Sequence, residues 1–315
     1  MKTTANESQL SRMLEGIGRV LVGKEETVLR ATATLLARGH LLIEDVPGIG
    51  KTLLGLALAR SIDADFRRIQ FTNDLMPSDV LGLNVYSPKE GRFDFRPGPI
   101  FSRIILADEI NRSTPKTQSA LLEAMSERQV SIEGTTHPLP EPFFVIATEN
   151  PIEYHGTFPL PEAQLDRFLM RVRIGYPSGL DERDILRGGD IADRLQALAP
   201  AMSCEDLLRL QEEVERVHAE DSILDYIVSI AKATRENPRV RLGLSPRGSL
   251  GLCRAAKAFA RISGRDYCVP DDVKRAAAPV VAHRLALTGD SGNANRAQEA
   301  EAFVDNLLSS LPAPA

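Results

Sequence analysis

Strand-like runs recur between residues 41 and 174, and stretches with helical spacing of apolar residues separate them. Each run has the length of a buried or half-buried strand. Strands that alternate with helices are typical of crossover connections and of a parallel sheet. The sequence therefore predicts an α/β core with strands at Leu41–Ile43, Arg68–Phe71, Ile104–Ala107, Phe143–Thr148 and Leu169–Ile174.

Two polar insertions interrupt this alternation. Residues Leu83–Pro99 alternate between apolar and polar around Lys89-Glu90-Gly91. Residues Gln129–Pro142 do the same around Glu133-Gly134-Thr135 and end at prolines. A glycine-containing turn between two alternating segments is typical of a β-hairpin, so each insertion is predicted to be one.

The chain has helical patterns on both sides of this core. Residues 8–39 carry two of them, separated near Val22-Gly23. Beyond Tyr176-Pro177-Ser178-Gly179 the strand-like runs stop, and apolar residues recur at helical spacing. We therefore expect an α/β core over residues 1–178 and a smaller, all-helical domain over residues 179–315.

An almost complete phosphate-binding loop, Asp-Val-Pro-Gly-Ile-Gly-Lys-Thr, occupies residues 45–52 between a predicted strand and a predicted helix. Such a turn points successive backbone N–H groups into one concavity, where they can bind a polyphosphate. Lys51 can reach the β- and γ-phosphates, and the Thr52 hydroxyl can bind magnesium. Asp45 stands where the pattern usually has its first glycine. The alternative is a Gly/Pro turn with a solvated lysine, but the strand-loop-helix context favours nucleotide binding.

Two carboxylates follow the strand at Ile104–Ala107. At this strand end Asp108 can hold magnesium through a water, and Glu109 can polarise a water for attack on the γ-phosphate. In isolation the pair would be better explained as an acidic helix cap, and the upstream loop favours catalysis instead. Asn150 ends the next strand, where its amide could bond the γ-phosphate and the water. Its alternative is a turn-forming asparagine before Pro151.

Composition and charge exclude several classes of protein. The chain of 315 residues is 43% hydrophobic and 26% charged, as expected of a globular protein, and its net charge of −5 argues against non-specific nucleic-acid binding. It has no apolar run of about 18 residues for a membrane span, and its first residues lack the apolar part of a signal peptide. Cys204, Cys253 and Cys268 lack metal-ligand spacing. We expect free thiols in a reducing compartment, by default the cytoplasm.

Six motifs follow one another along the chain, at Glu44–Thr52, Arg68–Thr72, Asp108–Arg112, Ala147–Pro151, Glu162–Phe168 and Leu244–Arg247. In sequence and in order they resemble those of the AAA+ ATPases, and specifically of the MoxR subfamily. The resemblance covers nearly the whole chain, and an aspartate at position 45 is itself what that subfamily tends to show.

The resemblance implies roles for individual residues. Asn150 matches sensor 1, Arg167 matches an arginine finger supplied to a neighbouring subunit, and Arg247 matches sensor 2 on a helical lid. From sequence alone, Arg167 could instead pair with Asp166 or Glu162 on the surface. The expected catalytic residues are Glu109, Asn150, Arg167 and Arg247, and the expected magnesium ligands are Thr52 and Asp108. The expected nucleotide-binding residues are Val22, Gly23, Pro47, Gly48, Ile49, Gly50, Lys51, Thr52 and Leu53.

The function that this resemblance implies is a magnesium-dependent ATPase that assembles into a ring, with six subunits expected. Such a ring would remodel or mature a client protein complex, together with a separate protein that carries a von Willebrand factor A domain. The two hairpins resemble inserts that face a central pore. The alternatives are a nucleic-acid or chelatase-type motor subunit, and a nucleotide switch that does not hydrolyse. The acidic charge disfavours a nucleic-acid motor, and the joint presence of Glu109, Asn150 and Arg167 disfavours a switch.

Overall fold

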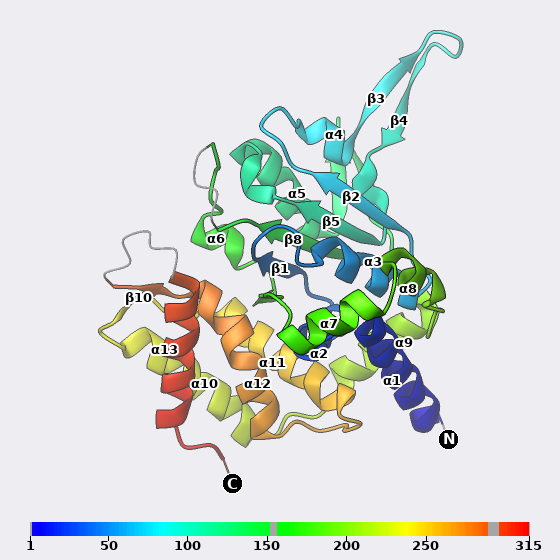
Figure 1. Ribbon diagram of the computed structural model, residues 1–315. Helices are drawn as coiled ribbons and strands as arrows, with labels where there is room; N and C mark the ends of the chain where they lie inside the picture. The colour runs from blue at the N-terminus through cyan, green and yellow to red at the C-terminus, as the bar shows by residue number, and fades with distance from the viewer. Residues whose placement is uncertain (1, 152–155, 289–295, 315) are drawn as a thin grey trace.

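The computed structural model describes residues 2–151, 156–288 and 296–314, with the backbone alone described over residues 2–7. A five-stranded parallel sheet lies at the centre of the core, in the order β2-β5-β8-β1-β9 (Figure 1). This confirms the predicted sheet, and the strand that precedes Asn150 does lie beside the carboxylate strand. The strands are β1 Leu41–Glu44, β2 Phe66–Gln70, β5 Ile104–Asp108, β8 Phe144–Glu149 and β9 Met170–Val172.

Apolar clusters cover both faces of this sheet, as is typical of parallel sheets, although the edge strand β2 exposes Arg67, Arg68 and Gln70. Alternate residues of β1 go to opposite sides: Leu41 and Ile43 join one apolar cluster, and Leu42 joins the other. The first cluster includes residues of α1, α2 and α3, and the second includes residues of α4 and α5. The helices of this part of the chain are α1 Lys2–Val20, α2 Glu25–Leu36, α3 Lys51–Ser61, α4 Pro77–Leu81, η1 Pro99–Phe101, η2 Ile110–Arg112, α5 Pro115–Glu127 and α6 Glu162–Leu165.

Both predicted hairpins are present. Strand β3 (Gly82–Ser87) pairs with β4 (Arg92–Pro97), and β6 (Gln129–Ile132) pairs with β7 (Thr135–Pro138). The β3–β4 hairpin projects well beyond the rest of the core (Figure 1). The two hairpins touch near their bases, where the Phe95 and His137 rings stack with centroids 3.9 Å apart.

The remainder of the chain is mostly helical, as predicted, but it contains one feature that the sequence did not indicate. Strands β10 (Val240–Leu242) and β11 (Ala286–Leu287) form a short antiparallel pair within the predicted all-helical domain. Strands of two or three residues are too short to show a periodic pattern. The helices are α7 Gly179–Arg187, α8 Ile191–Ala197, α9 Cys204–Arg216, α10 Asp221–Glu236, α11 Pro246–Ile262, α12 Pro270–Val281, η3 Ala282–Arg284 and α13 Arg296–Ser310.

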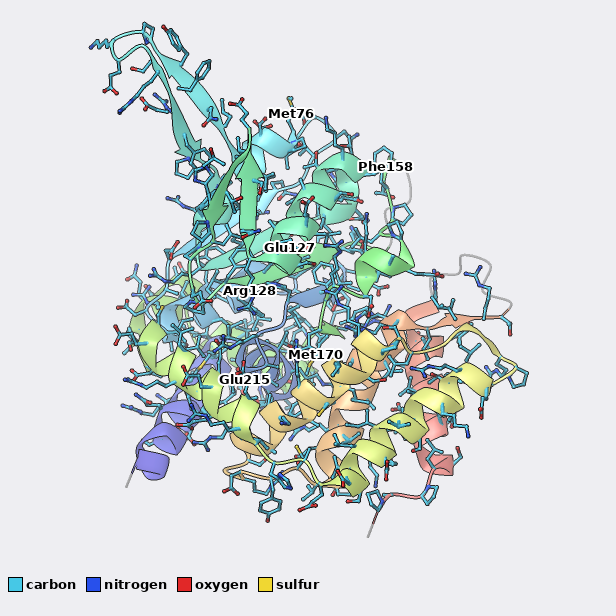
Figure 2. All side chains as sticks on the ribbon, turned by 180° about the vertical axis from the view of Figure 1, so that it is seen from behind. Met76, Glu127, Arg128, Phe158, Met170 and Glu215 are labelled. Atoms are coloured by element: carbon cyan, nitrogen blue, oxygen red, sulfur yellow. The ribbon has the colours of Figure 1, made fainter. Side chains whose placement is uncertain are left out.

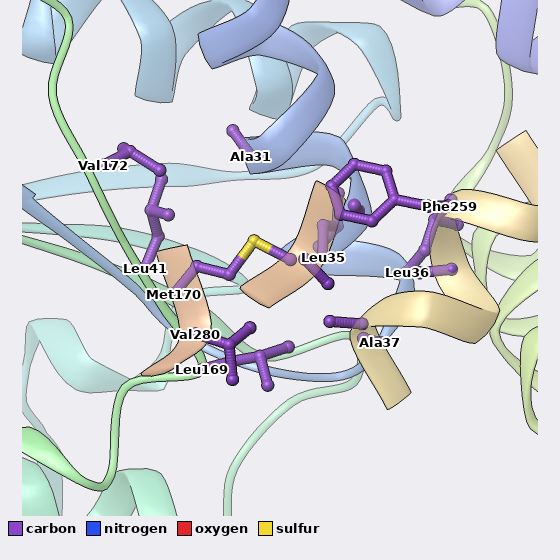
Figure 3. Packing of buried hydrophobic residues seen from close by; sticks show 14 of the residues in the cluster. Ala31, Leu35, Leu36, Ala37, Leu41, Leu169, Met170, Val172, Phe259 and Val280 are labelled. Atoms are coloured by element: carbon purple, nitrogen blue, oxygen red, sulfur yellow. The ribbon is translucent and has the colours of Figure 1, made fainter. Parts of the chain in front are cut away.

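One apolar cluster joins the helical region to the core. Figure 3 shows Leu35 and Leu36 of α2 and Met170 of β9 beside Phe259 of α11 and Val280 of α12, all of them buried. An ion pair also joins the helical region to the core: Glu215 of α9, labelled in Figure 2, lies 3.2 Å from Arg38. The helical region is therefore packed directly on the sheet. In the part of the chain that the structure describes, no helix is long and apolar enough to cross a membrane.

Candidate nucleotide site

The loop between β1 and α3 has the backbone of a phosphate-binding turn. Gly48 and Gly50 have φ angles of 83° and 96°, in the left-handed region that glycine adopts without steric cost. A Cβ atom at Gly48 would meet nothing within 4 Å, so the backbone angle, and not a lack of space, explains glycine there. Helix α3 begins directly after Gly50, so its N-terminus and unpaired N–H groups face the loop.

Asp45 has a structural role that its position in the motif did not reveal. Its Oδ1 accepts a hydrogen bond from the N–H of Val46 at 2.8 Å. Its Oδ2 accepts from the N–H groups of Ile174 and Gly175 at 2.8 and 2.7 Å. A glycine could make none of these bonds. The carboxylate therefore ties the loop to the segment that leads from β9 into the helical region.

Lys51 is buried and lies among carboxylates. Its Nζ donates to the backbone oxygens of Asp45 and, at 3.5 Å, Glu149. Burial lowers the pKa of Lys51, and the carboxylates of Asp108, Asp45 and Glu109 oppose that shift. A cation that burial disfavours gains from a nearby anion, so this ammonium group is suited to bind phosphate.

The two carboxylates at the end of β5 are fixed by Thr148 of the neighbouring strand. The Thr148 hydroxyl donates to Asp108 Oδ1 at 2.6 Å and accepts from the N–H of Glu109 at 2.8 Å. Glu109 has a φ angle of 56°, which is unusual for a residue with a side chain. Left-handed backbone at such a residue costs about 1–3 kcal/mol and occurs preferentially at functional sites.

Two side chains of β2 hold the same carboxylates, and the sequence interpretation gave them no role. Arg68 Nε donates to Asp108 Oδ2 at 2.9 Å, and Gln70 Nε2 donates to Glu109 Oε2 at 2.8 Å. Residues 68 and 70 share one face of the strand because side chains alternate along it. Arg68 and Gln70 are two residues apart on the strand next to the carboxylates. This spacing is the sequence signal that could have identified them as contacts of Asp108 and Glu109.

A cavity of about 510 Å³ brings most of the predicted residues together. Three residues of the helical region, Ile185, Ile191 and Arg194, also line it and were not predicted. Gly23 is not in its lining, although the neighbouring Val22 and Lys24 are; a Cβ atom at Gly23 would lie 2.3 Å from the Asp181 carboxylate. The predicted residues in its lining are Val22, Pro47, Gly48, Ile49, Gly50, Lys51, Thr52, Leu53, Asp108 and Glu109.

Arg167 lies outside the lining of this cavity. Its guanidinium donates to the backbone oxygen of Leu122 at 2.7 Å and to Ser126 Oγ at 2.8 Å. The predicted alternative was an ion pair with Asp166 or Glu162. These carboxylates pair instead with arginines of the helical region, namely Arg284 for Asp166, and Arg241 and Arg296 for Glu162.

Arg247 also lies outside the cavity lining and is exposed. It is the second residue of α11, whose N-terminus is capped by the Ser245 hydroxyl, which accepts from the N–H of Gly248 at 3.0 Å. The same hydroxyl donates to Asp166 Oδ2 at 3.2 Å. The Asp166 carboxylate therefore links the chain next to Arg167 to the N-terminus of the helix that carries Arg247.

Asn150 is buried at the end of β8 and lines a second cavity, of about 450 Å³, between the sheet and the helical region. Glu44 and Glu149 lie side by side in that lining, on the paired strands β1 and β8. Glu44 pairs with Arg171 at 3.0 Å. Burial raises the pKa of Glu149 to about 7, and the Glu44 carboxylate adds to that shift.

This shift predicts a dependence of stability on pH. The ordinary pKa of 4.5 applies to unfolded Glu149, so the folded state holds the extra proton between about pH 4.5 and 7. Stability should therefore fall as pH rises through this window, by about 3 kcal/mol, and should level off above it. In Glu149→Gln this contribution is absent. Urea denaturation gives the free energy of unfolding at pH 5 and at pH 8. The decrease between these two pH values should be about 2–3 kcal/mol smaller in the variant than in the unaltered protein. Equal losses in the two proteins would contradict the assignment.

Comparison with known proteins identifies the family. Residues 40–170 match the model of the ATPase family associated with various cellular activities, and residues 232–306 match that of the AAA lid domain. The chain is 51% identical over 305 residues to YeaC of Bacillus subtilis, covering 97% of this chain and 95% of that protein. It is 44% identical over 292 residues to the chaperone MoxR1 of Mycobacterium tuberculosis, covering 90% of this chain and 77% of that protein.

A solved structure supports the same assignment. The crystal structure of a protein from Cytophaga hutchinsonii that has been assigned as an ATPase superposes with a TM-score of 0.89. It is 36% identical in sequence, and the match covers 100% of this chain and 97% of that protein. With its phosphate-binding loop, its two carboxylates at the end of β5 and its helical lid, the chain belongs to the MoxR family of AAA+ ATPases.

Proposed function

We propose that this chain is a magnesium-dependent ATP hydrolase that works as a ring, expected to be a hexamer, and remodels a client protein complex. The observation that supports this most is the cavity in which the glycine loop, Lys51, Thr52, Asp108 and Glu109 come together. Membership of a family of ATPases supports nucleotide binding there. The free thiols Cys204, Cys253 and Cys268 are compatible with action in a reducing compartment such as the cytoplasm.

The side chains at this site suit magnesium. Thr52 and Asp108 line the same cavity and offer the hard oxygen ligands that this ion prefers. Among the described residues, no cluster of three His, Cys, Asp or Glu side chains could hold a metal alone. That fits an ion that keeps its waters and takes further oxygens from the nucleotide. When bound, it would neutralise charge on the phosphate oxygens.

Glu109 is proposed as the residue that orients the attacking water and accepts its proton. In the present arrangement Gln70 and Arg112 contact the Glu109 carboxylate, at 2.8 and 3.2 Å. Catalysis would require Glu109 to turn away from these partners toward the γ-phosphate. Lys51 and the loop N–H groups would hold that phosphate. Asn150 lines the other cavity, so its amide would have to turn toward the γ-phosphate to contact it.

Arg167 and Arg247 are proposed to act on the nucleotide of an adjacent subunit. Their position outside the cavity of their own chain favours action across an interface. An arginine supplied in this way can accelerate phosphoryl transfer by ~10³–10⁵-fold. Arg167 would have to exchange Leu122 and Ser126 for phosphate oxygens on assembly.

Mixing two inactive variants tests this shared site. Lys51→Ala removes ATP binding but leaves Arg167 for a neighbour, whereas Arg167→Ala binds ATP but supplies no finger. Each variant alone should hydrolyse ATP slowly, and rings assembled from both should recover turnover because some interfaces are complete. Absence of recovery in mixed rings, verified by native mass spectrometry, would show that Arg167 does not act in trans.

The proposed partner is a protein with a von Willebrand factor A domain, which would link the ring to its client. The projecting hairpin supports a contact of this kind, because Tyr86 and Phe93 are 52% and 65% exposed although they pair with one another. A Glu109→Gln ring should retain such a protein with ATP and release it with ADP, as judged by co-purification and mass spectrometry. Capture of nucleic acid alone, or of partners that bind equally with ATP and with ADP, would contradict this proposal and favour the motor alternative.

A further inference from the structure

The Asp166 carboxylate connects the two arginines that are proposed to act on a neighbour. Its Oδ1 accepts from Arg284 Nε at 2.6 Å, and its Oδ2 accepts from Ser245 Oγ at 3.2 Å. Asp166 directly precedes Arg167 in the chain, and Ser245 lies two residues before Arg247. One carboxylate therefore fixes the chain next to both arginines.

The Arg284 side chain, which pairs with Asp166, donates hydrogen bonds both to the core and to the helical region. It is only 4% exposed. On the core side it donates to the backbone oxygens of Phe168 at 2.6 Å and Leu169 at 3.1 Å. On the helical side it donates to the backbone oxygen of Val280 in α12. Burial lowers the pKa of Arg284, and the Asp166 carboxylate raises it, so the ion pair stabilises a cation that would otherwise be unfavourable.

Two further features restrict the backbone at Arg167, in addition to the Asp166 connection. The next residue, Phe168, is fully buried. The N–H of Arg167 donates to the Gln164 oxygen at 3.1 Å, which closes the end of α6. The guanidinium of Arg167 thus extends from a segment anchored in the core on one side and in η3 and α11 on the other. A change in the position of the helical region would move the second anchor.

The same helical region also contacts the nucleotide cavity of its own subunit. Ile185 of α7, together with Ile191 and Arg194 of α8, lines that cavity. Figure 1 shows α6 on the left, beside β10 and α13, and α8 on the right. The residues after 178 therefore make a nucleotide contact through α7 and α8, of which α8 packs on α1, and the separate Asp166 connection through η3 and α11.

We infer that Asp166 and Arg284 are positioning residues, through which the helical region of one subunit sets the arginines that it offers to the ATP of its neighbour. This inference rests on the proposed role of Arg167 in trans. Neither residue is suited to touch the nucleotide itself, because Arg284 is buried and the Asp166 carboxylate would repel phosphate. A displacement of a catalytic group by 1 Å can cost ~10²-fold in rate, so a loose connection should be measurable.

Asp166→Asn, introduced into one partner of the mixed ring at a time, tests the inference. In the first mixture the substitution is added to the Lys51→Ala subunit, which supplies the arginines. In the second it is added to the Arg167→Ala subunit, which binds the ATP. We expect the first mixture to lose about 10- to 100-fold of the recovered turnover and the second to keep it. ATP affinity, measured by calorimetry in the uniform Asp166→Asn ring, should stay within about twofold because the phosphate loop and Lys51, which hold the nucleotide, are unchanged.

The two mixtures contain the same substitution, so each is the control for folding in the other. Equal losses would mean that Asp166 serves folding or assembly only, and equal retention would mean that it has no role; either result overturns the inference while the shared site stands. No turnover in the unmodified mixture would instead overturn the proposed role of Arg167, and the inference with it. Asp225→Asn, an exposed position on α10, should leave both mixtures unchanged.

Discussion

Lys51→Ala is expected to remove most of the affinity for ATP. The Lys51 ammonium group lies in the electrostatic field of the Asp108, Asp45 and Glu109 carboxylates, all near the phosphate loop. Without it, these carboxylates would face a polyphosphate with one neutralising cation fewer, although Arg68 and Arg112 still pair with Asp108 and Glu109. Removal of one charge from a buried charge pair costs about 2–5 kcal/mol, so we expect ATP affinity to fall by about 30- to 4,000-fold.

Titration calorimetry with ATP and magnesium measures this directly. Lys232→Ala is a suitable control, because Lys232 lies on the exposed side of α10 and its ion pair with Glu236 is long, at 3.9 Å, and exposed. The control should bind ATP normally. A dissociation constant for Lys51→Ala within about threefold of the unaltered protein would be incompatible with phosphate binding at this loop.

Glu109→Gln is expected to separate binding from hydrolysis. The amide keeps the size of the side chain but cannot accept a proton from the attacking water. General-base catalysis typically contributes ~10²–10⁴-fold, so turnover should fall by that factor while ATP affinity stays near normal. The left-handed backbone of Glu109 and its bond to Thr148 do not involve the side chain, so the fold should be retained.

Steady-state phosphate release and calorimetry on the same preparation give both quantities. Glu123→Gln, an exposed glutamate on α5, is the matched control and should hydrolyse ATP at the normal rate. Turnover of Glu109→Gln close to that of the control would reassign Glu109 to the structural cap of η2, the alternative that the isolated Asp108-Glu109 pair left open.

The parts of the fold that could be predicted are those whose signal is local. The five strands and the two hairpins each follow from a run of alternating or apolar residues bounded by turns. The phosphate loop is equally local, because Gly48, Gly50 and Lys51 act within one turn of backbone. Ten of the predicted residues therefore line one cavity. Their catalytic and binding roles remain predictions.

The rest depends on contacts between distant segments, which no local pattern encodes. Ile185 and Arg194 reach the cavity only through the packing of their segment on the core, as in the contact of α8 with α1. The bonds from Gln70 to Glu109 and from Arg284 to Asp166 span 39 and 118 residues. Asp45 departs from the usual glycine of the motif, and its local sequence gave no reason for the aspartate. The reason lies in the fold, which brings the N–H groups of Ile174 and Gly175 to its carboxylate.

A cryo-electron microscopy map of the assembled Glu109→Gln ring with ATP and magnesium tests the central claim most directly, because it locates the nucleotide relative to two subunits. We expect the triphosphate on residues 48–52 of one subunit, magnesium beside Thr52 and Asp108, and Arg167 of the adjacent subunit within hydrogen-bond distance of the γ-phosphate. A nucleotide held wholly within one subunit, with Arg167 still bonded to Leu122 and Ser126, would contradict the account.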